Sequence, residues 1–272
     1  MFKKIFILSL AFLGCMAIAG AARAEVITID TDTTWSGEIA VGSDGVVVSD
    51  GATLTIKADA VVKMGTGASI IVNNANLILA GEAGKPAIIT SAAADPSPGD
   101  WGHIMTAGTS TLSMNYAKIE YGGGGGLSIP AYLFIQQSGP VSIENSDLLN
   151  NNGSILVYQA LDIEIHNSNI YNPDFCQDMG GVEFCGSSIL NLSSTQIDAV
   201  NNYWGSNEGP TTDPAGDLKG TVIQGDISYE PFLTQAYEPE IPGDPVCSSA
   251  DDFETIVLTA AKEYDPSTWF NE

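Results

Sequence analysis

The sequence predicts an all-β protein that folds as a single-stranded right-handed parallel β-helix, a solenoid of coils of about 22 residues, with a short helical tail at its C-terminal end. Two observations lead to this fold class. A short motif recurs along the chain at near-constant spacing, and each repeat contains runs of about four residues that alternate between apolar and polar side chains. Alternation at period two indicates strands with one buried face. Units too small to fold alone become stable when they stack.

The repeat is clearest in the second half of the chain. Asn145–Asn150 returns one unit later as Asn167–Asn172, and we place an earlier copy at Tyr116–Tyr121 and a further one at Ser194–Ala199. The same rhythm appears upstream, where Ala52–Ile56 is matched by Ala75–Leu79. Because such short strands cannot form a stable sheet within one unit, neighbouring coils must supply their pairing partners.

Longer intervals between copies are explained by insertions in turns, Gly122–Gly126 in one coil and Cys176–Cys185 in another. Asn145 and Asn167 stand at equivalent turn positions, where asparagine accepts left-handed backbone angles and its amides can stack as a ladder, so we expect both to be structural. A leucine-rich repeat has units of similar length, but its signature and a recurrent helical face are missing. A β-sandwich would need hairpins in place of a constant phase.

The two ends of the chain differ in composition from the repeat region. Lys3 and Lys4, a long apolar run and the small-residue site Ala22-Arg23-Ala24 together indicate a secretory signal peptide. Lipidation at Cys15, in a box that has Phe12 where leucine is usual, is the less favoured alternative. The far end is Pro-rich and then shows an apolar stripe at helical spacing. We therefore expect a signal peptide, a β-helix, a linker and an amphipathic helical tail, with bounds 1–24, 25–235, 236–248 and 249–272.

Charge excludes several classes of partner. The chain has 9 Lys and Arg against 33 Asp and Glu, a net charge of −24, and loss of Lys3, Lys4 and Arg23 with the signal peptide lowers it by three to −27. Phosphate recognition depends on lysine and arginine, so nucleic acid and anionic membranes are not expected partners. We expect an exported protein, secreted, periplasmic or on the cell surface, with no transmembrane segment after cleavage. The tail helix is expected to fold back on the β-helix or to dock on a partner.

Several segments carry a family resemblance. They are Trp35, Gly51–Ile56, Val61–Met64, Pro86–Ser91 and Pro98–Gly102 near the start, and Asn201–Ser206, Gly209–Pro210 and Tyr229–Leu233 near the end. These segments resemble the opening and closing coils of bacterial right-handed parallel β-helix repeat proteins of the pectin-lyase-like superfamily. The resemblance covers about Trp35–Thr234 and implies structural roles for Trp204 and Gly205 in the terminal coil. It does not imply one activity, because the superfamily holds enzymes and adhesins alike.

The enzymes of that superfamily provide a comparison for catalytic residues. Its lyases use a basic side chain, usually arginine, beside a uronate carboxylate, commonly with calcium, and its galacturonan hydrolases share Asn-Thr-Asp, Asp-Asp, Gly-His and Arg-Ile-Lys motifs. Residues 25–272 contain no arginine, the repeat region has none of these motifs, and the one acidic pair, Asp251-Asp252, lies in the tail. The sequence therefore favours a non-catalytic protein that binds a glycan or a protein or serves as a scaffold. The alternative is a polysaccharide-acting lyase or hydrolase with a non-standard site.

Four residues are candidates for a binding site: Asp100, Trp101, His103 and Tyr121. Asp100 and His103 bring an acid and an imidazole close together, which suits proton transfer, although a packed histidine is the commoner outcome. Trp101 and Tyr121 offer rings that could stack on sugars. We expect no catalytic residue, no resident metal and no cofactor. Calcium would bind only weakly, because no calcium-loop pattern is present.

The cysteines indicate a covalent constraint. Cys176 and Cys185 have eight residues between them in a turn insertion of an exported chain, which predicts a disulfide that closes this loop. Cys247 is left over. It is free, bridges two chains or competes for one of the loop cysteines, and the sequence does not choose among these states.

Overall fold

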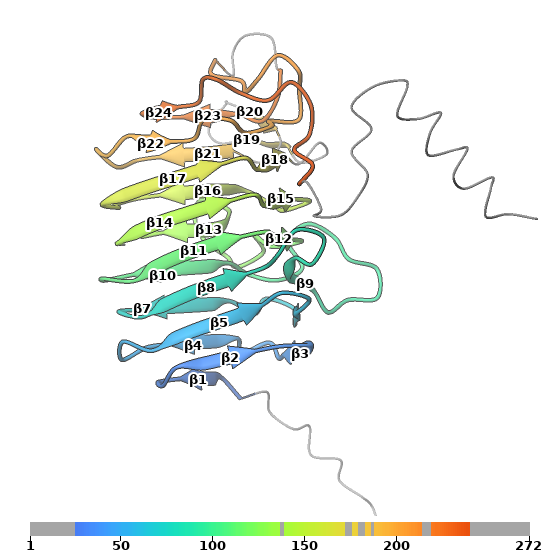
Figure 1. The fold of residues 1–272 in the computed structure, drawn as a ribbon, viewed down its shortest axis with the longest axis vertical. Helices are drawn as coiled ribbons and strands as arrows, with labels where there is room; N and C mark the ends of the chain where they lie inside the picture. Colours follow the sequence, from blue (N-terminus) through green and yellow to red (C-terminus); the bar gives the residue numbers. More distant parts are fainter. Residues whose placement is uncertain are drawn as a thin grey trace, which may run out of the picture.

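The computed structural model describes residues 25–136, 139–171, 176–178, 183–185, 188–213 and 219–239, and for 176–178, 183–185 and 188 it describes the backbone alone. The strands stack into three parallel sheets (Figure 1), so the predicted all-β parallel β-helix is confirmed. The predicted signal peptide and tail helix lie outside the described residues, as does most of the linker. In the part of the chain that is described, no helix is long and apolar enough to cross a membrane.

Three parallel sheets, named A, B and C, run along the solenoid, and every coil contributes to them in turn. In chain order, sheet A consists of β1 (Ile27–Ile29), β4 (Val46–Val48), β7 (Ile70–Asn73), β10 (Ile104–Ala107), β13 (Ala131–Ile135), β16 (Ser154–Val157), β21 (Ser188–Asn191) and β23 (Ile223–Gln224). Sheet B consists of β2 (Thr33–Trp35), β5 (Thr53–Lys57), β8 (Asn76–Ala80), β11 (Thr111–Asn115), β14 (Pro140–Glu144), β17 (Asp162–His166), β22 (Ile197–Asp198) and β24 (Ile227–Ser228). Sheet C consists of β3 (Glu38–Val41), β6 (Val61–Met64), β9 (Ala87–Ser91), β12 (Ala117–Glu120), β15 (Asp147–Leu149) and β18 (Asn169–Tyr171). A separate antiparallel pair is formed by β19 (Cys176–Asp178) and β20 (Glu183–Cys185).

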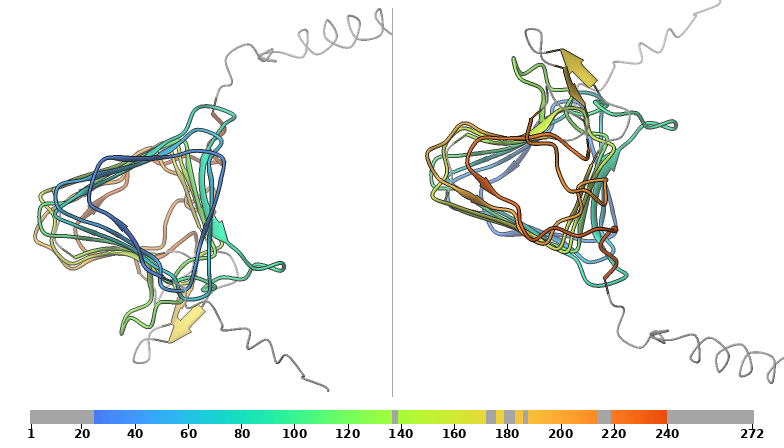
Figure 2. Two further views of the ribbon diagram at one scale, coloured as in Figure 1. Left: turned by 90° about the horizontal axis from the view of Figure 1, so that it is seen from below. Right: turned by 90° about the horizontal axis from the view of Figure 1, so that it is seen from above.

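Seen along its axis, the solenoid has a triangular cross-section (Figure 2). We name its three edges by what they carry. The groove edge joins sheet A to sheet B, the strap edge joins sheet B to sheet C, and the insertion edge joins sheet C back to sheet A. The long loops, including the β19–β20 pair, all project from the insertion edge.

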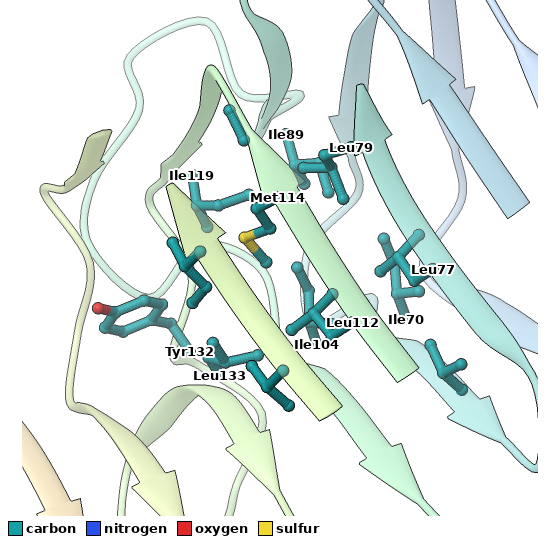
Figure 3. Close-up of a cluster of buried hydrophobic side chains, with 14 of the residues drawn as sticks. Ile70, Leu77, Leu79, Ile89, Ile104, Leu112, Met114, Ile119, Tyr132 and Leu133 are labelled. Atoms are coloured by element: carbon teal, nitrogen blue, oxygen red, sulfur yellow. The ribbon is translucent and has the colours of Figure 1, made fainter. Parts of the chain in front are cut away.

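The core fills the inside of the triangle. Leu54, Leu77 and Leu112 stack at paired positions of sheet B and are 0–1% exposed, and Figure 3 shows the middle of this cluster with side chains from all three sheets meeting. Burying such a side chain contributes roughly 1.5–3 kcal/mol. Because each coil buries its apolar face only against its neighbours, stability comes from stacking, as in other solenoids.

The length of a coil depends on its insertions, whereas the register of the sheets does not. Asp147 pairs with Asn169 at a sequence separation of 22, and Thr53 pairs with Asn76 at a separation of 23, which agrees with the predicted unit. Asn76 pairs with Thr111 at a separation of 35, because this coil carries an added loop at the insertion edge. The repeat unit predicted from the sequence is therefore the coil without insertions.

One predicted repeat copy is wrong. Asn145 and Asn167 follow paired residues of β14 and β17, and the next member of their column is Asn201, whose carbonyl accepts the N–H of Asn167 at 3.1 Å. Ser194 lies instead at the groove edge, in the turn between β21 of sheet A and β22 of sheet B. The intervening coil has a longer insertion than the sequence spacing suggested, so a match by residue similarity alone was displaced.

Inside the strap edge, a buried polar ladder replaces the apolar core. Ser146, Ser168 and Asn202 are 0–1% exposed. The hydroxyl of Ser168 accepts the N–H of Ser146 at 3.1 Å, and the side-chain oxygen of Asn202 accepts the N–H of Ser168 at 2.9 Å. Each rung thus satisfies a backbone donor of the coil before it, which a buried turn requires.

After the last coil the chain runs back over the strap edge. The N–H of Tyr237 donates to the side-chain oxygen of Asn169 at 2.7 Å, and the Asn169 amide donates to the Tyr237 carbonyl at 3.0 Å. The Tyr237 hydroxyl donates to Asn145, one coil further toward the N-terminus, at 2.8 Å. We call residues 233–239 the strap, because they tie the C-terminal end to the middle of the solenoid.

Candidate functional site

Two places on the solenoid carry candidate functional residues. The insertion edge holds the residues that the sequence predicts, and the groove edge holds residues that the sequence did not indicate.

At the insertion edge, Trp101 is a packing residue. Its indole is 0% exposed, and its Nε1 donates to the Glu120 carbonyl at 2.7 Å. A Cβ placed on Gly122 would lie 2.7 Å from the ring, so glycine at 122 is what lets the next coil close over the indole. A ring without an exposed face has no surface on which a sugar could stack, which removes Trp101 as a stacking platform.

Asp100 and His103 do not form an acid–imidazole pair. The Asp100 carboxylate accepts hydrogen bonds from the Ser91 hydroxyl at 2.7 Å and from the Ser97 N–H at 3.0 Å, so it fixes its own loop. His103 is 7% exposed, and burial lowers its pKa below the ordinary 6.5. Its Nδ1 has no hydrogen-bond partner among the described residues, and a Cβ on Gly125 would lie 2.4 Å from it. The imidazole is thus enclosed by the glycine loop, where burial favours its neutral form.

Tyr121 is held by its backbone. It adopts a φ of 65°, uncommon for a bulky residue, its N–H donates to the Asn150 carbonyl at 3.1 Å, and its ring is partly buried against the core. The glycines that follow make close backbone contacts with the previous coil, such as Gly123 N–H to the Gly102 carbonyl at 2.6 Å. The structure therefore brings the four sequence candidates to one edge, but as a packed support and not as an open site.

The residues predicted to be structural lie in turns and in the terminal coil. Asn145 and Asn167 have φ of 52° and 51°. Trp204 is completely buried, and Gly205, with φ of 81°, packs where a Cβ would meet the Tyr171 ring.

The predicted disulfide falls on residues whose backbone alone is described. Cys176 and Cys185 are directly paired across the antiparallel β19–β20 ladder. Directly opposed residues of an antiparallel pair have Cα atoms roughly 4.5–5.5 Å apart, within the range that a disulfide bridges. The bond itself stays a prediction.

The groove edge carries an open groove of about 700 Å³. It lies along the turns that join sheet A to sheet B in four consecutive coils, between β10 and β11, β13 and β14, β16 and β17, and β21 and β22, where three to five residues separate the two strands. The described lining residues of these turns are 108–109, 139, 158–161 and 192–195. The turn before this set, 74–75, and the turn after it, 225–226, have two residues each. The groove is therefore a bounded feature, made where the turns are longer.

Apolar side chains are exposed in this groove. Tyr158 is 62% exposed, Leu161 78% and Leu192 50%, which makes them three of the four large exposed hydrophobic residues within the described part of the chain. Tyr158 and Leu192 are adjacent, because each follows directly on the pair Val157 and Asn191. Contiguous exposed apolar surface of this kind marks interaction sites.

The remaining lining residues are small or carry hydroxyl and amide groups. Thr109, Gln159 and Ser194 are exposed. The hydroxyls of Ser193 and Thr195 instead stabilise the turn nearest the C-terminal end. Ser193 donates to Asn191 Oδ1 at 2.6 Å, and Thr195 donates to the Ala160 carbonyl at 2.8 Å. No acidic or basic side chain is among the described residues that line the groove, in a chain of net charge −24.

Sequence reasoning missed this site for a physical reason. Leu161 continues the alternation of Ile163 and Ile165, so it reads as a core residue, whereas the structure places it in the turn before β17 and in solvent. The signal that could have found it is a set of apolar residues in successive turns, at Tyr158, Leu161 and Leu192.

Part of the chain is similar to a known protein family. Residues 27–128 match the model of a pectate-lyase-like beta helix domain. Over these residues, the family resemblance expected from the sequence is confirmed. The matched part of the chain holds the buried Trp101 and His103, whereas most of the groove lies beyond it. No curated protein and no solved structure matches the chain. Among the described residues, no group of three or more His, Cys, Asp or Glu side chains is placed to hold a metal ion.

Proposed function

We propose that this protein is an exported, non-catalytic β-helix that binds carbohydrate in the groove of the groove edge. The observation that carries the proposal is the exposed Tyr158 ring, flanked by Leu161 and Leu192 and by exposed hydroxyl and amide groups. A sugar ring has an apolar face and a rim of hydroxyls, so an aromatic face beside hydrogen-bonding groups is its natural complement.

The lining of the groove favours binding over catalysis. General acid–base chemistry at a glycosidic bond needs carboxylates or an equivalent proton carrier in reach of the substrate. The phenol of Tyr158 is the one ionisable side chain among the described lining residues. A single phenol does not provide the pair of carboxylates on which such a reaction depends.

The competing proposal is a polysaccharide-acting enzyme, favoured by the match to a pectate-lyase-like domain. Charge and residue inventory speak against it, because residues 25–272 contain no arginine to take the part of the lyase base.

The test is a binding and turnover experiment on the full chain. We expect binding to at least one member of a panel of soluble polysaccharides, weakened about tenfold in Tyr158→Ala and largely retained in Tyr158→Phe, since phenylalanine keeps the stacking face. Val26→Ala is the matched control, because Val26 is exposed but lies in the first coil, far from the groove. Incubation of the same polysaccharides with calcium is expected to release neither unsaturated products nor new reducing ends. Product formation, or binding indifferent to Tyr158, would overturn the proposal.

A further inference from the structure

The shape of the groove constrains the ligand beyond its chemical type. We propose that the groove takes a linear, uncharged glycan chain that lies parallel to the solenoid axis and contacts all four turns. This inference rests on the proposed function and deepens it, since it names the class, the direction and the length of the ligand.

The direction follows from the register. The four turns follow paired strands of sheet A in consecutive coils, so the described lining residues of the groove succeed one another along the axis. Thr109 lies at the lower end of the groove, which is nearer the N-terminal coil, Tyr158 lies near the centre, and Ser194 lies at the upper end, which is nearer the C-terminal coil. Coils repeat at about 4.8 Å, so four turns span roughly 14 Å, the length of a short oligosaccharide segment. A chain lying across the axis would meet one turn only.

The shorter turns on either side limit this length. On the N-terminal side of the groove, the two-residue turn 74–75 places Asn74 against Gly108 and Thr109, and the Asn74 side-chain oxygen accepts the Thr109 N–H at 3.2 Å. Above it, the chain between β23 and β24 closes with two residues, and Asp226 accepts the Asn191 amide through its carbonyl at 2.8 Å. The outer sugar units of a longer glycan would extend beyond these ends and make no further contacts with the groove.

The absence of charge on the ligand follows from the rim. Asp162 directly follows the groove residue Leu161 and is exposed, and exposed Asp226 lies at the upper end, where its carboxylate accepts the Gln196 amide at 2.8 Å. No lysine or arginine is among the described groove residues to balance a carboxylate on the ligand. A uronate chain would therefore approach carboxylates with no cation to neutralise it, an arrangement that costs affinity. The groove is thus suited to neutral sugars and not to the polyanion after which the matched domain is named.

The experiment is calorimetric titration of the full chain with neutral oligosaccharides of two to six units, in glucose-, xylose-, mannose- and galactose-based series, and with oligogalacturonates of the same lengths. At least one neutral series is expected to bind with an affinity that rises with length and levels off once the four turns are filled. Oligogalacturonates of equal length are expected to bind at least tenfold more weakly.

Variants at the two ends test the direction. Thr109→Ala and Ser194→Ala each remove one exposed hydroxyl, and each is expected to weaken the longest oligomer of the binding series about threefold or more, as loss of a hydrogen bond does. A disaccharide is too short to contact both ends, so at most one of the two variants is expected to affect it. Gln224→Ala, beyond the upper end, is the control and leaves both affinities unchanged.

The outcomes separate the two proposals. Failure of every oligosaccharide to bind removes carbohydrate binding and this inference together. Binding that depends on Tyr158 but not on length, or on neither end, leaves the proposed function standing and overturns the axial mode. Equal affinity for neutral and uronate chains overturns the charge argument. A basic protein captured through Tyr158 in place of any glycan would assign the groove to a protein partner and refute both.

Discussion

Substitution of the buried Asn202 measures directly how much the polar ladder of the strap edge contributes to stability. Asn202 is 0% exposed, and its side chain accepts the Ser168 N–H at 2.9 Å and donates to the carbonyls of Ala199, at 2.8 Å, and Ile165. Asn202→Ala leaves three buried backbone groups without these partners. A buried group left unsatisfied costs about 1–3 kcal/mol, so for three groups we expect a loss of at least about 3 kcal/mol in the free energy of unfolding. That is a large part of the ~5–15 kcal/mol typical of a folded domain.

The assay is equilibrium urea denaturation followed by tryptophan fluorescence, with Trp204 two residues away as a reporter. Asn202→Leu fills the space that the alanine variant leaves open, so it keeps water out and is expected to lose at least as much. Gln159→Ala is the matched control, because it removes the same amide group from an exposed position and should shift stability by less than about 0.5 kcal/mol. Should both Asn202 variants cost less than about 1 kcal/mol, the ladder would not stabilise the turn column as we argue.

Three further outcomes are expected. Burial lowers the pKa of His103, so below about pH 6.5 the unfolded chain takes up a proton that the folded protein resists, and the free energy of unfolding should fall as the pH drops from 6.5 toward the folded pKa. In urea titrations from pH 5 to 8, His103→Gln should flatten this fall. Parallel pH profiles for the two proteins would contradict the assignment to His103. Gly122→Ala places a Cβ 2.7 Å from the buried ring of Trp101 and should cost about 1–3 kcal/mol in the same assay, whereas Gly139→Ala, whose nearest contact is 3.2 Å, should cost clearly less. Thiol titration of the exported protein in guanidinium should find at most one free thiol before reduction and three after it, since the cysteines of β19 and β20 are paired in register. Three free thiols at the outset would exclude the disulfide.

Much of the fold was predictable because its information is local. Alternation within four or five residues sets which face of a strand is buried, and the recurrence of Asn145 at Asn167 sets the coil length where no loop intervenes. The copy placed at Ser194 was wrong because the length of an insertion cannot be inferred from the repeat alone. Parallel pairing tolerates added residues at the insertion edge without a change of register. The sequence separation between two repeat copies therefore does not predict which residues pair when an insertion lies between them.

The site was less predictable, since it depends on which turns become neighbours. Asp100, Trp101, His103 and Tyr121 were chosen by residue type, and the structure does bring them together, but with the Trp101 ring and the His103 imidazole enclosed. The groove is assembled from turns in four coils, and no single coil contains its pattern. Exposure of Leu161 in particular depends on how its turn leaves the sheet, which alternation does not encode.

The strap has a mechanical consequence. Because Tyr237 bonds to Asn169 and Asn145, tension applied at the C-terminal end would reach the solenoid in its middle coils. The last two coils, which contain β21–β22 and β23–β24, would be bypassed. Strand-by-strand unfolding from that end would begin only after these hydrogen bonds had broken. Whatever follows residue 239 is thereby anchored to the coils of Asn145 and Asn169 and not to the last coil.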